Sequence, residues 1–161
     1  MTESTWRGSP GCPVRIASAW LLALLATSPA ARAAADAVDT AGDWLTEDFR
    51  GVIHVGQCDA TYCGSVVGIS DWQKDGSPPK DTEGRSQCQL VIIKDMKMED
   101  DGRRHGTVTN PQDGRTYLAE MWVEEGVLQL RGYVAVPLLG STQHWKPFHG
   151  TRKPDCHFSR G

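Results

Sequence analysis

The sequence lacks the features that would place it among nucleic-acid-binding or membrane-spanning proteins. Its 17 Lys and Arg residues are outnumbered by 20 Asp and Glu residues, and a protein that grips a phosphate backbone needs a basic face. The longest apolar run, Ile16 to Ala26, has 11 residues, whereas a transmembrane helix needs about 20. We therefore expect no nucleic-acid partner and no stable membrane span.

Motifs of the common catalytic classes are also missing. There is no Gly-x-Ser-x-Gly elbow for a nucleophilic serine and no glycine-rich phosphate loop. The adjacent carboxylates of Glu47 and Asp48 would point to opposite faces of a strand, so they do not form an acid–base pair. His144, His149 and His157 gather near the carboxy terminus, but their spacing matches no standard metal site. The sequence predicts no catalytic residues, no metal site and no cofactor.

The first 33 residues have the three parts of a cleaved secretory signal. A polar start that carries Arg7 and Arg15 precedes the short apolar run, and small residues follow it. The pattern at 31–33 predicts cleavage after Ala33, and 33–35 fits as well. Removal of 1–33 leaves 14 basic and 19 acidic residues. We expect a periplasmic or secreted protein in which residues 34–41 form a short linker.

The cysteines predict disulfides. Cys12 would leave with the signal, and an even number in an exported chain favours disulfide pairing, with three arrangements open for four cysteines. Cys58 and Cys63 flank a turn-like stretch and can lie at bridging distance. Cys88 with Cys156 would then tie the carboxy-terminal tail to the domain. Zinc is the alternative, but Cys-x4-Cys is a poor half-site.

Short β-rich runs, separated by turn residues, make up the rest of the chain. This spacing is typical of an all-β sandwich or barrel. Strands are expected over residues 44–46, 50–58, 62–69, 89–93, 104–109, 115–124, 127–134 and 142–148, with a long loop at 71–87. Sequential antiparallel strands most readily close into a small up-and-down β-barrel of about eight strands. A two-sheet sandwich is the alternative. The barrel domain is expected at 42–148, followed by a flexible tail at 149–161.

Several short motifs occur in a characteristic order. They are Gly42-Asp43-Trp44, Tyr62-Cys63-Gly64, Asp113-Gly114-Arg115-Thr116-Tyr117, Leu130-Arg131-Gly132-Tyr133, Pro137-Leu138-Leu139-Gly140 and Gln143-His144-Trp145. Together they resemble the bacterial exported family known as domain of unknown function 2147, over roughly Gly42 to Phe148. The resemblance implies a lipocalin-like β-barrel that is secreted or periplasmic. It brings no established activity, ligand or catalytic residue.

The Gly42-x-Trp44 motif is also similar to the motif at the start of the first lipocalin strand. That resemblance implies that Trp44 closes the base of the barrel beneath a basic side chain from a late strand, a role that Arg131 could fill. A guanidinium over an indole contributes about 0.5–2 kcal/mol. With Tyr117 and Tyr133, these two residues form the predicted ligand-binding set.

The orientation of one strand decides whether that set can bind a ligand. Gln129, Arg131 and Tyr133 share a face, because side chains repeat every two residues along a strand. If this face points inward, the barrel holds a polar cluster that can bind an anion or a carboxylate. If it points outward, the core is filled from the other face by Leu128, Leu130 and Val134.

Two functions remain in view. The first is an exported barrel that binds a small apolar or amphiphilic ligand in the cell envelope. The alternative is a structural or protein-interaction module of the periplasm, which would use its outer face or the 71–87 loop to bind an envelope protein partner. An enzyme is the weakest hypothesis, because no convergent set of titratable groups is visible in the sequence.

Overall fold

The computed structural model of the chain describes residues 39–159. The predicted signal at 1–33, its cleavage site, Cys12 and the beginning of the 34–41 linker lie outside the described residues, as do the last two residues of the tail. All of these remain predictions.

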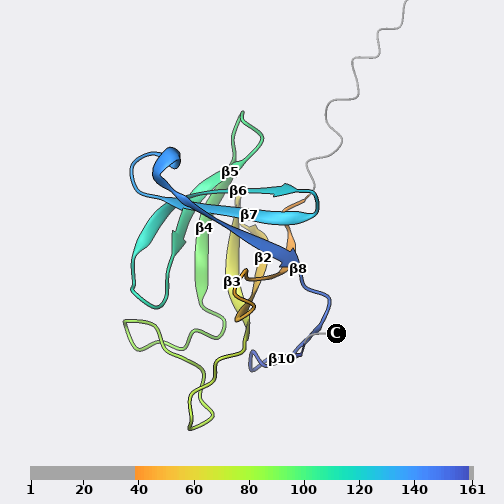
Figure 1. Ribbon diagram of the computed structural model, residues 1–161, viewed down its shortest axis with the longest axis vertical. Coiled ribbons are helices and arrows are strands. Elements are labelled where there is room, and N and C mark those ends of the chain that lie inside the picture. Colours follow the sequence, from red (N-terminus) through yellow and green to blue (C-terminus); the bar gives the residue numbers. More distant parts are fainter. Residues whose placement is uncertain (1–38, 160–161) are drawn as a thin grey trace, which may run out of the picture. The chain divides into compact units, whose positions relative to one another are not determined.

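Eight antiparallel strands close into one barrel, in which each strand pairs with its sequence neighbours and β1 pairs with β8 (Figure 1). The strands are β1 (Gly42–Leu45), β2 (Gly51–Cys58), β3 (Thr61–Ile69), β4 (Val91–Met98), β5 (Arg104–Thr109), β6 (Thr116–Glu124), β7 (Val127–Tyr133) and β8 (Ser141–Pro147). A short 3-10 turn, η1 (Pro137–Leu139), connects the last two strands. The predicted up-and-down barrel is confirmed, and the two-sheet sandwich is wrong. Closure leaves none of the eight strands as an unpaired edge.

Turn chemistry fixes the register of the long hairpin made by β6 and β7. Glu125 and Gly126 both have positive φ, 51° and 76°. A two-residue hairpin turn whose twist matches that of its strands requires such values. Glu124 then pairs with Val127, and Met121 pairs with Leu130. This register places the buried residues Ala119, Met121, Leu128 and Leu130 on the inner face.

Strand β4 runs to Met98, whereas the sequence predicted its end at Ile93. Charged residues follow Ile93, but a bulge lets them stay outside. The pairing with β5 is irregular between Lys94 and Lys97, and Asp95 has a φ of 57°. Because the bulge interrupts the alternation, Met96 is fully buried between exposed neighbours. Simple alternation could not predict this continuation.

The barrel encloses an apolar core of buried side chains. Its buried members come from every strand except β5 and include Trp44, Ile53, Val66, Ile93, Met96, Met121, Leu128, Leu130 and Trp145. Burial of such side chains contributes roughly 1.5–3 kcal/mol each relative to an exposed position. The interior of this barrel is therefore partly a filled core.

Both favoured disulfide pairings are present. Cys58–Cys63 joins the ends of β2 and β3, and Cys88–Cys156 joins the long 70–90 connection to the tail; the Cα atoms lie 5.7 Å apart in each. Cys156 is fully buried in the core cluster. Since both thiols of the second pair are oxidised, Cys156 is not a metal ligand.

The described part of the tail is structured, contrary to the expectation of a flexible end. Strands β9 (Thr151–Arg152) and β10 (Phe158–Ser159) pair as a small hairpin. The Ile69 N–H donates to the Cys156 carbonyl at 2.8 Å, and Arg152 Nε contacts Asp43 Oδ2 at 2.7 Å. His157 stacks on Trp72, with ring centroids 3.7 Å apart. The tail is therefore held by a disulfide, a backbone bond, an ion pair and a ring stack.

Candidate functional site

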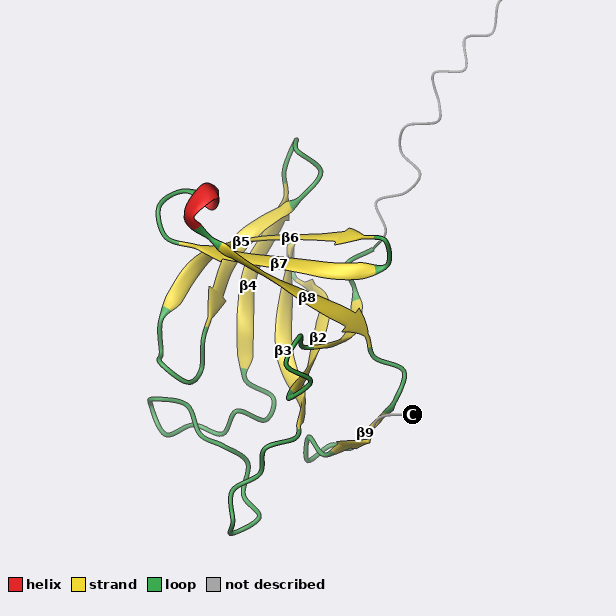
Figure 2. Ribbon diagram, in the orientation of Figure 1, coloured by secondary structure: helices red, strands yellow, loops and turns green. Residues whose placement is uncertain are grey.

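A cavity of about 730 Å³ lies at one end of the barrel and is lined in part by residues of the β1–β2, β3–β4 and β5–β6 connections. Figure 2 draws these connections as green loops. Volumes of roughly 300–1,000 Å³ are typical of small-molecule sites. The mouths of β-barrels are among the places where such sites occur.

The strand residues of the cavity wall are mainly apolar, whereas the loops add polar side chains such as Gln87, Asn110 and Gln112. The wall is lined from successive strands by Ile53, Val66, Ile92, Val108, Tyr117, Leu130, Gly132, Gln143 and Trp145. Among these strand residues, Trp145 Nε1 donates to Gln143 Oε1 at 2.8 Å. This wall offers dispersion contacts and hydrophobic burial to a ligand, and it presents no group poised for acid–base chemistry.

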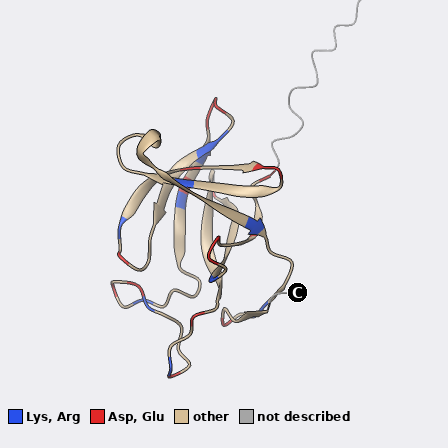
Figure 3. Cartoon of the chain, viewed as in Figure 1, with Lys and Arg blue, Asp and Glu red and all other residues tan. Residues whose placement is uncertain are grey.

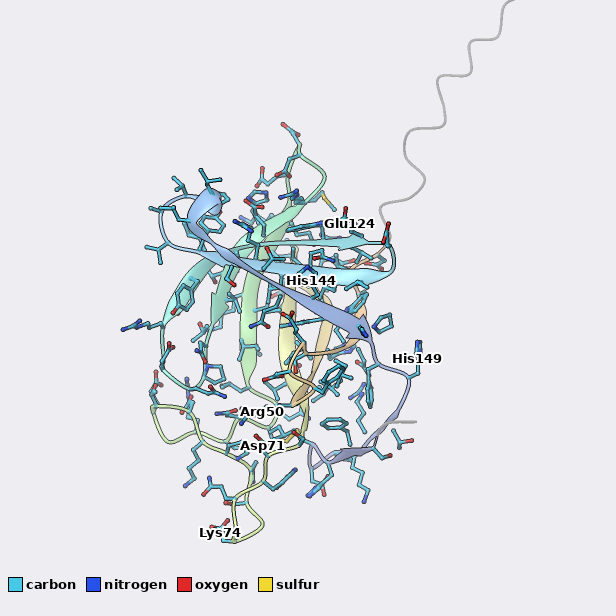
Figure 4. The ribbon with its side chains drawn as sticks, viewed as in Figure 1. Arg50, Asp71, Lys74, Glu124, His144 and His149 are labelled. Atoms are coloured by element: carbon cyan, nitrogen blue, oxygen red, sulfur yellow. A yellow bond between two sulfur atoms is a disulfide. The ribbon has the colours of Figure 1, made fainter. Side chains whose placement is uncertain are left out.

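The rim of the cavity is charged. Arg50, at the end of the β1–β2 turn, forms an ion pair with Asp71 of the long connection (Figure 4). Asp48 accepts hydrogen bonds from Thr46 Oγ1 at 2.7 Å and from the Arg50 N–H at 3.1 Å, so it is committed to the turn. Lys80 also lines the cavity. Within residues 39–159, no carboxylate oxygen lies within 4 Å of its ammonium. Lys80 is therefore a cation that a ligand at the mouth could engage.

The long 70–90 connection is built from local turns that position Lys80. Asp81 Oδ2 pairs with Arg85 at 2.7 Å, and the Gln87 N–H donates to the Pro79 carbonyl at 2.8 Å. Burial would raise the pKa of Asp81, but the hydrogen bonds from Arg85 and Glu83 outweigh it and lower that pKa. Asp81 is thus ionised at neutral pH and holds the loop in shape beside Lys80.

A second hollow, of about 490 Å³, lies at the opposite end of the barrel. Its two cations are already engaged. Arg104 lies over the ring of Tyr62, 3.6 Å from the centroid, and donates to Thr40 Oγ1 at 3.0 Å. Arg103 pairs with Glu120 at 2.8 Å and lies over Trp122. This end has fewer groups left for a ligand than the first cavity has.

The structure brings Tyr117, alone of the four predicted ligand-binding residues, to the cavity wall. Trp44 is buried in the core, and its Nε1 donates to the Thr40 carbonyl at 2.9 Å. Arg131 and Tyr133 share the outer face of β7, because Leu130 and Gly132 line the cavity and side chains alternate along a strand. A ligand contact through Tyr117 remains a prediction.

Arg131 does not cover Trp44 as the lipocalin resemblance implied. Its Nε donates to the Pro137 carbonyl at 2.7 Å and its Nη1 to Thr142 Oγ1 at 2.8 Å. The outward alternative is the one that the structure shows: Leu128 and Leu130 are buried, although Val134 is exposed. Burial raises the pKa of the Tyr133 hydroxyl, and the charges of Glu120 and Asp101 add to the effect, so this phenol is neutral at pH 7.

Several lining residues were not predicted. Gly132 and Leu130 follow from the same alternation that moves Arg131 outward, so the orientation of β7 was the missing information. Arg50 and Lys80 belong to loops, and loop positions carry no periodicity from which their place could be inferred.

Within residues 39–159, no cluster of three or more His, Cys, Asp or Glu side chains could hold a metal ion. In the same part of the chain, no helix is long and apolar enough to cross a membrane.

Comparison with known proteins agrees with this architecture. A solved structure described as protein HP1028 from the human pathogen Helicobacter pylori, which belongs to the lipocalin family, matches with a TM-score of 0.55 and 19% identity, over 69% of this chain and 84% of that chain. At this identity the likeness shows the fold. No curated protein matches the chain. The family described as "Uncharacterized protein conserved in bacteria (DUF2147)" matches residues 42–147, which span β1 to β8. The chain therefore belongs to this bacterial family and has a lipocalin-like barrel.

Proposed function

We propose that this barrel binds a small amphiphilic molecule, with the apolar part inside the cavity and the polar part at the rim. The observation that carries the proposal is the polarity of the 730 Å³ cavity, whose wall of mainly apolar strand residues ends in a rim with Arg50, Asp71 and Lys80. A ligand oriented this way buries its apolar surface at roughly 25 cal/mol per Å² and keeps its charged group near water.

The rim offers one cation, Lys80, to an anionic headgroup. Two cations, Arg50 and Lys80, and two carboxylates, Asp48 and Asp71, line the cavity, so their formal charges cancel. Arg50 is paired with Asp71, and Asp48 accepts hydrogen bonds within its own turn. Lys80 remains as a cation at the mouth, and an exposed ammonium attracts a carboxylate or phosphate modestly, by about 0.2–1 kcal/mol. Most of the affinity would then come from the apolar part, and the charge would select among ligands of equal chain length.

We also propose that the protein works in the cell envelope, outside the cytoplasm. Two disulfides support this location, since such bonds persist in oxidising compartments and are rare in the cytosol. The amino-terminal pattern at 1–33 supports it independently.

The proposal is tested by titrating the exported protein with a dansyl-labelled fatty acid and displacing the probe with surfactants of equal chain length. We expect saturable binding of one probe per chain, with an anionic surfactant displacing it at lower concentration than a cationic one. Lys80→Gln should reduce this preference, whereas Lys153→Gln, in the tail, should leave it unchanged. Non-saturable binding, or binding equal to that of heat-unfolded protein, would refute the proposal.

A protein-interaction module is the second candidate function, and the 70–90 connection is what favours it. This exposed segment is held by its own hydrogen bonds. The Ser77 N–H donates to Asp75 Oδ1 at 2.9 Å, and Arg85 Nε donates to Asp81 Oδ2 at 2.7 Å. An ordered exposed loop can present a fixed surface to a partner. This candidate predicts a protein partner in pull-downs that a chain with an altered loop loses, and no thermal shift with small molecules.

A further inference from the structure

The β7–β8 connection exposes an apolar surface. Residues 134–140, Val-Ala-Val-Pro-Leu-Leu-Gly, contain no polar or charged side chain, and Figure 3 shows no acidic or basic residue there. Leu138 is 86% exposed and Leu139 77%, and Val134 and Val136 are exposed as well. Large aliphatic side chains grouped on one protruding segment are unusual on a soluble monomer and mark interaction sites. We call residues 134–140 the apolar loop.

The backbone of the apolar loop is largely satisfied from within. The Val136 N–H donates to the Val134 carbonyl at 2.9 Å, the Leu139 N–H to the Val136 carbonyl at 3.2 Å, and the Gly140 N–H to the Pro137 carbonyl at 2.9 Å. Pro137 has no N–H to satisfy. An unpaired backbone polar group costs several kcal/mol in a hydrocarbon environment. This loop can therefore enter an apolar phase without losing most of its hydrogen bonds.

Arg131 supports the loop from beneath. Its guanidinium donates to the Pro137 carbonyl at 2.7 Å and to the Leu138 carbonyl at 3.5 Å. The arrangement places a permanent positive charge at the base of the apolar tip, about where phosphate groups lie when a short segment enters the outer layer of a bilayer. Arg131 thus both satisfies loop carbonyls and supplies a charge of the sign that phospholipid headgroups attract.

We propose that the apolar loop docks the barrel reversibly onto the surface of a lipid bilayer. Gly132 and Ser141, near the strand ends on either side of the loop, line the cavity, so the loop lies next to the cavity wall. A protein partner is disfavoured by area. If each of four aliphatic side chains loses on the order of 100 Å², the loop buries about 400 Å², half of the roughly 800 Å² per partner of a stable protein interface. Shallow insertion of a few side chains is enough for weak, reversible attachment to a bilayer.

The test uses protein recovered from the periplasm of an expression host, with its amino terminus shown by mass spectrometry to begin after residue 33. Sedimentation with sucrose-loaded vesicles of phosphatidylcholine, and of phosphatidylcholine mixed with phosphatidylglycerol, measures the partition coefficient. We expect the parent chain to bind both, more strongly with phosphatidylglycerol. The Leu138→Ser/Leu139→Ser double variant should partition at least about tenfold less. The Leu138→Ile/Leu139→Ile variant should restore binding.

Met98→Ser is the matched control, since this exposed apolar residue ends β4 at the opposite end of the barrel. It should bind vesicles within twofold of the parent chain. Gly132→Leu fills the cavity and leaves the loop intact, so it separates this proposal from the ligand-binding proposal. This variant should still bind vesicles. Equal sedimentation of the parent and the Leu138→Ser/Leu139→Ser variant would overturn the proposal. A dimer that this variant dissociates, without any vesicle binding, would assign the loop to a second copy of the chain and overturn it too.

Discussion

Removal of the Cys88–Cys156 disulfide should destabilise the protein about twice as much as removal of Cys58–Cys63. The two bonds span 68 and 5 residues of sequence. In the chain-entropy model, the loop of 68 residues contributes about 4 kcal/mol to the free energy of unfolding at 25 °C, and the loop of 5 residues about 2 kcal/mol. Because Cys156 is fully buried and its backbone carbonyl accepts from Ile69, loosening the tail should add to the larger cost.

The assay is equilibrium unfolding in urea of the parent chain and of two double variants, Cys88→Ala/Cys156→Ala and Cys58→Ala/Cys63→Ala. Each variant removes one disulfide and leaves no new free thiol, so the two are matched controls for each other. We expect the first to lose about 4 kcal/mol and the second about 2 kcal/mol. An equal loss in both variants, or a larger loss from the short loop, would refute the argument that the tail bond stabilises the fold by closing a long loop.

Two further predictions concern packing and pH. Gly106→Ala should lower the free energy of unfolding by about 3 kcal/mol, because the added Cβ would lie 2.5 Å from a backbone carbonyl oxygen of β4. Thermal unfolding measures the loss. The control is Gly132→Ala, which should be nearly neutral because its Cβ would have only ordinary contacts at 3.6 Å and beyond. The backbone N–H of Arg103 and the side chain of His105 lower the pKa of Asp101. The lowered pKa stabilises the folded state at pH values above the pKa of Asp101 in the unfolded chain, about 3.9. This stabilisation is lost as the pH falls through the pKa of Asp101 in the folded chain. Tm should therefore drop between pH 5 and pH 3, and Asp101→Asn should show a smaller drop; an unchanged pH profile in that variant would contradict the assignment.

Much of the barrel could be predicted because its strands obey simple rules. The turn at Glu125-Gly126 and the alternation in β6 and β7 identify a hairpin from local residues alone. The pairing of Cys88 with Cys156 could be favoured because these two cysteines remain once Cys58 and Cys63 pair across their turn and Cys12 leaves with the predicted signal. The closure into a barrel was predicted from the series of sequential strands, and the family resemblance implied the same barrel.

The rest depended on contacts that no local pattern contains. The bulge at Asp95 lets β4 continue past its charged residues, and it exists because Gly106 on β5 has no side chain to block it. Arg131 points outward because the apolar residues of β7 alternate with it, and the lipocalin resemblance favoured the opposite face. The hairpin in the tail is held by partners more than 60 residues away in sequence, such as Cys88 and Asp43.

The central claim is that the cavity at the mouth of the barrel holds the apolar part of a ligand. Gly132→Leu tests it most directly, because a side chain at this position would extend into the cavity from a Cβ that lies 3.6 Å from Val108 and 3.7 Å from Tyr117. The measurement is the dissociation constant of the dansyl-labelled fatty acid, with Thr151→Leu, which adds leucine to the exposed tail hairpin, as the control. We expect roughly tenfold or weaker binding in Gly132→Leu, an unchanged value in Thr151→Leu, and a similar Tm in both. Equal affinity of the parent chain and a folded Gly132→Leu variant would contradict the account, since the ligand would then bind elsewhere.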